Sequence, residues 1–208
     1  MLTLKVLPLG PLETNSHIIH NETHAIFVDV GGDPTPLLSY IEHHSLTLEA
    51  VYMTHLHFDH IYGLSHVLRK HAVPAYVYEE DCYLLNHALL RPELYGLPPL
   101  TIDYTFTYIE PGQHTILGEP VEVSHTPGHT RGSLCYYFPQ SKFVITGDVL
   151  FYQTIGRTDL PGGDYPTLAT SIREKLFILP DETLVYPGHG RYTTIGHEKE
   201  YNPALEEF

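Results

Sequence analysis

The sequence has few cysteines and few basic residues, and both shortages narrow the classes of protein it can be. Cys82 and Cys135 lie far apart and belong to no CxxC pair, which argues against a disulfide framework and a thiolate zinc site. We expect both thiols to be buried and inert. Lys and Arg total 11 against 25 Asp and Glu, and the net charge of -14 argues against nucleic acid and anionic lipid as partners.

Long apolar runs are also missing. No segment approaches the roughly 20 apolar residues of a membrane span, and the first residues, MLTLKVLPLGPLETN, lack the features of a signal peptide. We therefore expect a cytoplasmic protein with a small-molecule substrate and no membrane partner. The 208 residues, 42% of them hydrophobic and 17% charged, predict one globular domain spanning residues 1–208. Nothing in the sequence indicates the oligomeric state.

Alternating and helical periodicities divide the chain into two similar halves. The first three strands are spaced as sequential antiparallel neighbours, and later strands alternate with helices. We expect strands at residues 2–9, 16–21, 24–32, 48–54, 74–80, 104–110, 120–125, 133–138, 142–148 and 183–189, and helices at residues 34–45, 61–71, 80–90 and 166–179. Two mostly sheet halves with outer helices predict an α/β protein in which two facing sheets are covered by helices.

Metal-binding side chains gather where the predicted strands end. Imidazoles and carboxylates suit zinc, manganese and iron, and alternate residues of an extended segment project to the same side. The strand ends read THLHFDH, HTPGHT, TGD and YPGHG, and they supply His55, His57, Asp59, His60, His129, Asp148 and His189. A lone histidine such as His17, His71 or His87 is ordinarily structural, whereas this ordered constellation predicts a metal centre.

The spacing divides these side chains between two ions. We expect His55 and His57 with His129 to supply three nitrogens to one ion, Asp59 and His60 with His189 to bind the second, and Asp148 to place one oxygen on each. Glycines at 128, 147, 188 and 190 allow the backbone to bend closely around the cluster.

The HxHxDH motif and the later histidine and aspartate tips resemble the metallo-β-lactamase superfamily, and within it the glyoxalase II-like hydrolases in a short single-domain form. The resemblance covers essentially the whole chain. It implies a four-layer αββα sandwich with a dinuclear site along one edge between the sheets.

Two divalent ions about 3.5 to 4 Å apart can share a water and lower its pKa from about 15.7 to near 7. The expected reaction is therefore attack of a bridging hydroxide on a carbonyl that one ion polarises. Asp59 and Asp148 are the predicted catalytic carboxylates, Asp59 because it can orient the hydroxide. Zinc is the expected metal, with iron and manganese as alternatives.

The substrate prediction depends on the leaving group. No strong general acid is evident, and a thiolate leaves with little help because the pKa of a free thiol is about 8.5. Thioester hydrolysis of an S-lactoylglutathione-like substrate fits, giving D-lactate and free glutathione. The stretch LFYQTIGRTDLPGGDYPTL resembles the segment after the bridging aspartate in glyoxalase II-like enzymes and persulfide dioxygenases. Arg157 is the predicted substrate anchor, with an ordinary ion pair to Asp159 or Asp164 as the alternative, and Tyr152 is expected to line the groove.

Other functions stay open. The sequence stops without the helical C-terminal domain that completes glutathione binding in typical glyoxalase II, so recognition of glutathione is uncertain from the sequence. A mononuclear-iron persulfide dioxygenase would use His55, His129 and Asp148. Hydrolysis of another ester, a lactone, a β-lactam or a phosphoester also occurs on this fold, and a metal that only staples the fold is the non-catalytic reading. The PGHG end and TTIGHE favour the hydrolase.

Overall fold

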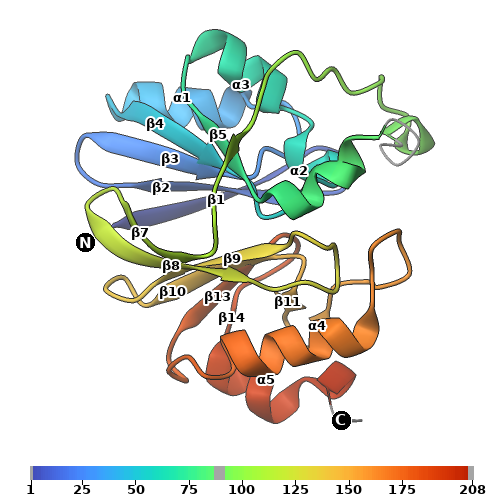
Figure 1. The fold of residues 1–208 in the computed structure, drawn as a ribbon. Helices are drawn as coiled ribbons and strands as arrows, with labels where there is room; N and C mark the ends of the chain where they lie inside the picture. Colours follow the sequence, from blue (N-terminus) through green and yellow to red (C-terminus); the bar gives the residue numbers. More distant parts are fainter. Residues whose placement is uncertain (1, 87–91, 206–208) are drawn as a thin grey trace. The chain divides into compact units, whose positions relative to one another are not determined.

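The structure is a computed structural model, and it describes residues 2–86 and 92–205. The chain divides into two compact units, Met1–Ile109 and Glu110–Phe208, and each has its own sheet and helices (Figure 1). The prediction of one domain spanning residues 1–208 stays a prediction. Within the described residues, no helix is long and apolar enough to cross a membrane.

The first unit contains a six-stranded sheet in the order β1-β2-β3-β4-β5-β6. Its strands are β1 (Thr3–Leu9), β2 (Thr14–His20), β3 (His24–Val28), β4 (Thr47–Tyr52), β5 (Ala75–Val77) and β6 (Thr107–Tyr108). β1 to β3 pair antiparallel, as predicted, and the remaining pairs are parallel. Parallel neighbours need a crossover, which here carries α1 (Thr35–His43) between β3 and β4, and α2 (Phe58–Ile61) with α3 (Leu64–Lys70) between β4 and β5.

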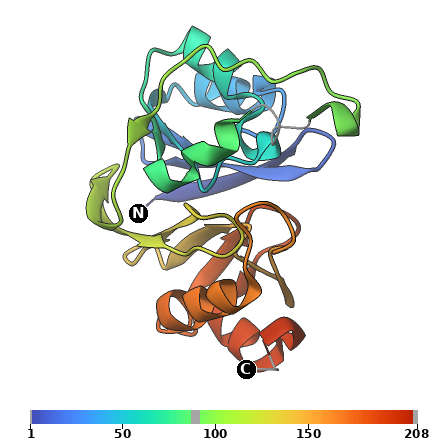
Figure 2. The same ribbon diagram turned by 45° about the vertical axis from the view of Figure 1, so that its right-hand side comes forward.

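Two helices of the first unit differ from the predictions in where they end or whether they are continuous. α1 buries Leu37, Leu38 and Ile41 on one face, and it ends at His43, two residues before the predicted end at residue 45. The predicted helix at residues 61–71 is interrupted at Gly63, where an added Cβ would lie 1.9 Å from the carbonyl oxygen of Gly32. α1 and α3 lie on the same face of the sheet (Figures 1 and 2).

Shorter helices occupy the connection from β5 to β6. The helix predicted at residues 80–90 is a 3-10 helix, η1 (Glu79–Leu85), and the end of that prediction lies outside the described residues. A second 3-10 turn, η2 (Pro92–Tyr95), follows. The strand predicted at residues 104–110 is reduced to the two residues of β6.

The second unit contains a six-stranded sheet in the order β14-β13-β10-β9-β8-β7 and a small hairpin, β11 (Leu150–Phe151) with β12 (Thr154–Ile155). The strands of the large sheet are β7 (Gly112–Ile116), β8 (Glu119–His125), β9 (Leu134–Phe138), β10 (Phe143–Gly147), β13 (Leu184–Pro187) and β14 (Thr193–Thr194). Only β10 and β13 pair parallel. β7, β14 and the hairpin are not anticipated by the sequence analysis.

The crossover from β10 to β13 carries the helical layer of this unit. α4 (Tyr165–Ser171) runs into a π-helical turn, η3 (Ile172–Leu176), and α5 (Ile195–Tyr201) with η4 (Pro203–Leu205) follows β14. Figure 2 shows α4 and α5 on the same face of the sheet. The Asp164 carboxylate caps α4 by accepting from the backbone N–H of Thr167 at 3.0 Å. Leu168, Ile172 and Leu176 are fully or almost fully buried in the apolar core of the unit, each contributing about 1.5–3 kcal/mol.

Candidate metal centre

In the first unit the predicted ligands lie at the carboxyl end of β4. His57 has extended backbone angles and α2 begins at the next residue, so the strand end and the helix start meet within the motif. The Nε2 atom of His55 lies 3.1 Å from Nδ1 of His57. The Nε2 atom of His60 lies 3.7 Å from Oδ2 of Asp59. This unit therefore presents two separate pairs of donor atoms.

A buried carboxylate behind these residues fixes which ring nitrogen carries the proton. Asp29 directly follows β3, and its Oδ1 accepts from the backbone N–H of Thr54 at 2.8 Å. Its Oδ2 accepts from the Thr54 hydroxyl at 2.7 Å and faces Nδ1 of His60 at 2.8 Å. Because a carboxylate only accepts, Nδ1 of His60 donates and Nε2 keeps its lone pair.

The same carboxylate acts on His55 through Thr54. The Thr54 hydroxyl has one proton and gives it to Asp29, so its oxygen accepts from Nδ1 of His55 at 3.1 Å. His55 consequently also keeps the lone pair on Nε2. Asp29, Thr54 and His60 are at most 1% exposed, so these hydrogen bonds are shielded from water.

Two further contacts position the motif. Oδ2 of Asp59 accepts from the Thr14 hydroxyl at 3.1 Å. The buried Asp81 accepts from the backbone N–H of Leu56 at 2.6 Å and so holds the segment between the two histidines. The first contact holds the Asp59 carboxylate, and the second holds the backbone between His55 and His57.

In the second unit a carboxylate stands between two imidazoles. Asp148 follows β10, His129 lies in the loop after β8, and His189 follows β13. Oδ2 of Asp148 is 3.6 Å from Nε2 of His129 and 3.6 Å from Nε2 of His189. Nδ1 of His129 donates to the carbonyl oxygen of Arg157 at 2.8 Å, which leaves Nε2 of His129 with its lone pair toward the carboxylate.

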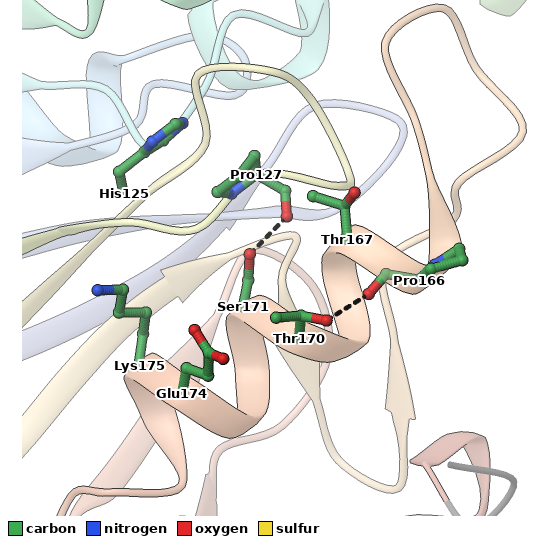
Figure 3. A pocket seen from close by; sticks show the side chains of 8 residues that line it. All are labelled: His125, Pro127, Pro166, Thr167, Thr170, Ser171, Glu174 and Lys175. Atoms are coloured by element: carbon green, nitrogen blue, oxygen red, sulfur yellow. Dashed lines mark hydrogen bonds between the residues drawn. The ribbon is translucent and has the colours of Figure 1, made fainter.

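The His129 loop is fixed against α4. Ser171 donates to the carbonyl oxygen of Pro127 at 2.8 Å, beside a pocket of about 440 Å³ (Figure 3). The backbone N–H of Asp164 donates to the carbonyl oxygen of Gly128 at 2.8 Å. Gly128 has a φ of +126°, and an added Cβ would lie 2.3 Å from the backbone nitrogen of Leu168. Only glycine allows this close approach, which sets the position of His129.

The donor separations in each unit suit metal coordination. Two ligand atoms each about 2.0–2.1 Å from a tetrahedral ion are separated by about 3.3 Å. The separations of 3.1 and 3.7 Å in the first unit and of 3.6 Å on either side of Asp148 in the second bracket this value. The nitrogen and oxygen donor types suit zinc, iron and manganese.

Comparison with known proteins identifies the family. The model of the metallo-beta-lactamase superfamily matches residues 9–189. The chain belongs to the metallo-β-lactamase superfamily. The predicted metallo-β-lactamase fold is thereby confirmed, and the two sheets with mixed α/β content agree with it.

Similar members of the superfamily match the chain over nearly its whole length. "Probable metallo-hydrolase YqgX" of Bacillus subtilis is 37% identical over 97% of each chain. "Hydroxyacylglutathione hydrolase GloC" of Haemophilus influenzae is 37% identical over 98% of each chain. The crystal structure of the BLEG-1 B3 metallo-β-lactamase has a TM-score of 0.92 at 38% identity, covering 98% of this chain and 100% of that one. TTHA1623 in a di-iron-bound form has a TM-score of 0.85 at 34% identity, covering 96% and 98%.

Arg157 and Tyr152, the predicted substrate contacts, both have partners within the protein. Arg157 makes a two-pronged ion pair with Asp159, with both N···O distances at 2.7 Å, which is the alternative that the sequence left open. Hydrogen bonding from Arg157 lowers the pKa of Asp159 to about 2. Asp164 instead caps α4. Tyr152 stacks on His197 with ring centroids 5.1 Å apart. Roles for Arg157 and Tyr152 in substrate binding stay predictions.

Sequence reasoning misses the residues that orient the ligands. Asp29 lies inside the strand predicted at residues 24–32, whereas β3 ends at Val28, so a strand end placed correctly would have marked this carboxylate as a candidate. Thr54 and Asp81 carry no comparable signal, because their role depends on partners distant in the chain. His17 is structural as expected: it is fully buried, and burial is the main cause that lowers its pKa to about 4, against the opposing charge of Asp29.

Proposed function

We propose that the chain is a metal-dependent hydrolase that binds two divalent ions. The observation that carries the proposal is the carboxylate of Asp148, whose Oδ2 lies 3.6 Å from Nε2 of both His129 and His189, the imidazoles assigned to the two ions. The first ion takes His55, His57 and His129, the second takes Asp59, His60 and His189, and Asp148 contributes to both. A family model that spans residues 9–189 includes all seven positions and supports their joint use.

Zinc or iron is the metal that we infer. Imidazole and carboxylate donors without thiolate suit zinc, iron and manganese alike. The di-iron-bound form of TTHA1623, 34% identical to this chain, supports iron as an alternative to zinc.

The side chains of the site divide the work of hydrolysis. Two bound divalent ions supply an activated water and polarise the carbonyl of the substrate. Asp29 and Thr54 keep the His55 and His60 lone pairs on the Nε2 atoms, so the ligands need no proton rearrangement before binding. Thr14 donates to Asp59 and holds the carboxylate that we assign to orienting the attacking water.

A thioester is the substrate class that we propose, with S-lactoylglutathione as the model compound. A thiol with a pKa of about 8.5 leaves as a thiolate and takes no proton from the enzyme. The name hydroxyacylglutathione hydrolase for the GloC relative, 37% identical over 98% of this chain, supports this class. A β-lactam is the second candidate because BLEG-1, named a B3 metallo-β-lactamase, is 38% identical with a TM-score of 0.92.

Metal counting combined with three parallel assays tests the function. We expect about two ions per chain by elemental analysis, together with cleavage of S-lactoylglutathione that chelator abolishes. Asp148→Asn should lower the metal content and abolish the activity. Asp103→Asn, at an exposed residue that pairs with Arg69, should retain the metal content and the activity. Faster cleavage of a chromogenic cephalosporin would favour the β-lactam candidate. One iron per chain with oxygen uptake on glutathione persulfide would replace hydrolysis with the persulfide dioxygenase reaction.

A further inference from the structure

The second unit has a pocket of about 580 Å³, and some of its lining residues are close to predicted ligands in the sequence. Its lining residues are Tyr152, Arg191, Tyr192, Thr193, Thr194 and His197, which we call the Arg191 pocket. Arg191 comes two residues after His189, and the ring of Phe151, beside Tyr152, lies 6.3 Å from the His189 ring. Two lining residues, Tyr152 and Arg191, are thus close in the sequence to Phe151 and His189, whose rings approach each other in this unit.

Arg191 is held in a way that suits anion binding. Its guanidinium carbon lies 3.4 Å from the centroid of the Tyr152 ring. Tyr152 stacks in turn on His197 at an interplanar angle of 15°. A guanidinium placed over a ring can still bind a carboxylate with two parallel hydrogen bonds from its N–H groups.

The charges around Arg191 also bear on what the pocket can bind. The structure gives it no carboxylate partner within residues 2–86 and 92–205. Four other cations there do have one: Arg69 pairs with Asp103, Lys142 with Glu182, Arg157 with Asp159, and Lys199 with Asp181. In a chain with a net charge of -14, a cation in a pocket without a local anion favours an anionic ligand.

One hydroxyl adds a donor to this pocket. Thr194 Oγ1 accepts from the backbone N–H of His197 at 3.2 Å, so its own proton remains to be donated. The Thr193 hydroxyl is occupied because it donates to Glu198 at 2.6 Å.

We propose that the Arg191 pocket binds a carboxylate of the substrate's thiol part, with Arg191 as the anchor and Tyr152 as its platform. This deepens and rests on the proposed thioester hydrolysis. The carboxylate lies on the thiol part because a lactoyl group carries no charge. Arg191 is the better anchor of the two arginines, since the Nε and Nη2 groups of Arg157 already donate to Asp159.

Kinetics with paired substrates test the assignment. S-Lactoylglutathione and its dimethyl ester contain the same thioester and differ only in their carboxylates. Arg191→Gln should lower kcat/KM for the acid by about 10–100-fold and for the ester by less than about 2-fold. Arg69→Gln, which removes an exposed arginine of the first unit, should change neither. An equal loss on both substrates, or a carboxylate-dependent loss found in Arg157→Gln alone, overturns the proposal.

A binding measurement separates this inference from the hydrolase itself. S-Methylglutathione contains a thioether that cannot be hydrolysed, and calorimetry with it reports the carboxylate contact without turnover. We expect Arg191→Gln to weaken its binding by about 10–100-fold, even if wild-type protein cleaves no thioester and the proposed function fails. Absence of binding to the wild type, or equal binding to wild type and variant, overturns the inference, while cleavage of the thioester would leave the proposed function intact.

Discussion

Replacing Asp29 by Asn tests how strongly the candidate ligands depend on the buried carboxylate behind them. Asn has nearly the same size, but it offers one accepting oxygen and an NH₂ group. If the oxygen accepts from the Thr54 backbone N–H, the NH₂ group faces Nδ1 of His60, which must then accept. The His60 proton moves to Nε2, the atom that faces Asp59, and the ring no longer offers its lone pair there. In the flipped amide, the NH₂ group faces the Thr54 N–H instead, so two donors meet and that hydrogen bond is lost.

The expected magnitude follows from these contacts. Loss of a partner that orients a metal-bound histidine typically lowers metal affinity by about 10–100-fold. We expect that loss for the ion assigned to His60, and a smaller one for the ion assigned to His55, which Asp29 reaches only through Thr54. The apo-protein should also lose about 1.5–3 kcal/mol of unfolding free energy, the value of one hydrogen bond to a buried charge.

Chelator competition and denaturant unfolding measure these two quantities separately. Titration of loaded protein with a chromogenic chelator gives both metal affinities, and urea unfolding of the apo-protein gives the free energy. Asp103→Asn is the matched control, because it removes an exposed carboxylate that accepts from Ser65 and Arg69 in the same unit. Unchanged metal affinities in Asp29→Asn would refute the argument that Asp29 sets the protonation of the ligands.

Three further predictions concern packing, pH and thiol reactivity. Gly128→Ala should cost about 1–3 kcal/mol more unfolding free energy in denaturant than Gly112→Ala, because both have positive φ but only Gly128 meets another backbone, that of Leu168; equal losses would contradict this. Burial lowers the pKa of His17 to about 4, so between pH 4 and 6.5 the unfolded chain binds more protons and stability rises with pH, by about 3 kcal/mol in total. His17→Gln should flatten this rise in unfolding measured across that window, and an unaltered slope would exclude His17 as its source. Burial raises the pKa of Cys135 to about 12, so a thiol reagent should label Cys135 only after unfolding, and rapid labelling of native protein would disprove it.

The fold was predictable where local patterns agree with tertiary packing. The antiparallel order of β1 to β3 and the buried stripe of α1 follow from alternation and helical spacing. The helix at residues 61–71 was predicted as continuous because its periodicity is unbroken, but contact of Gly63 with the distant Gly32 interrupts it. α5 was missed because IGHEKEY offers little apolar periodicity, and it is fixed by contacts such as that of Glu198 with Thr193.

The candidate site was predictable to the extent that its residues carry a motif. HxHxDH and the later tips point to nitrogen and oxygen donors, and within each unit neighbouring donor atoms lie 3.1–3.7 Å apart; their use as metal ligands stays a prediction. The partnership of Asp29 with Thr54 joins residues far apart in the chain, so no local spacing encodes it. For Arg157 the sequence left two interpretations open, a substrate contact and an ion pair, and the structure has the ion pair with Asp159.

The contact of His129 with residue 157 uses the main chain alone: Nδ1 donates to the carbonyl oxygen, while the guanidinium points to Asp159. Any amino acid at this position supplies the same carbonyl. Selection can therefore exchange the side chain at 157, and with it local charge, while the imidazole keeps its orientation. A substitution at residue 157 can therefore alter the charge near the site without changing the orientation of His129.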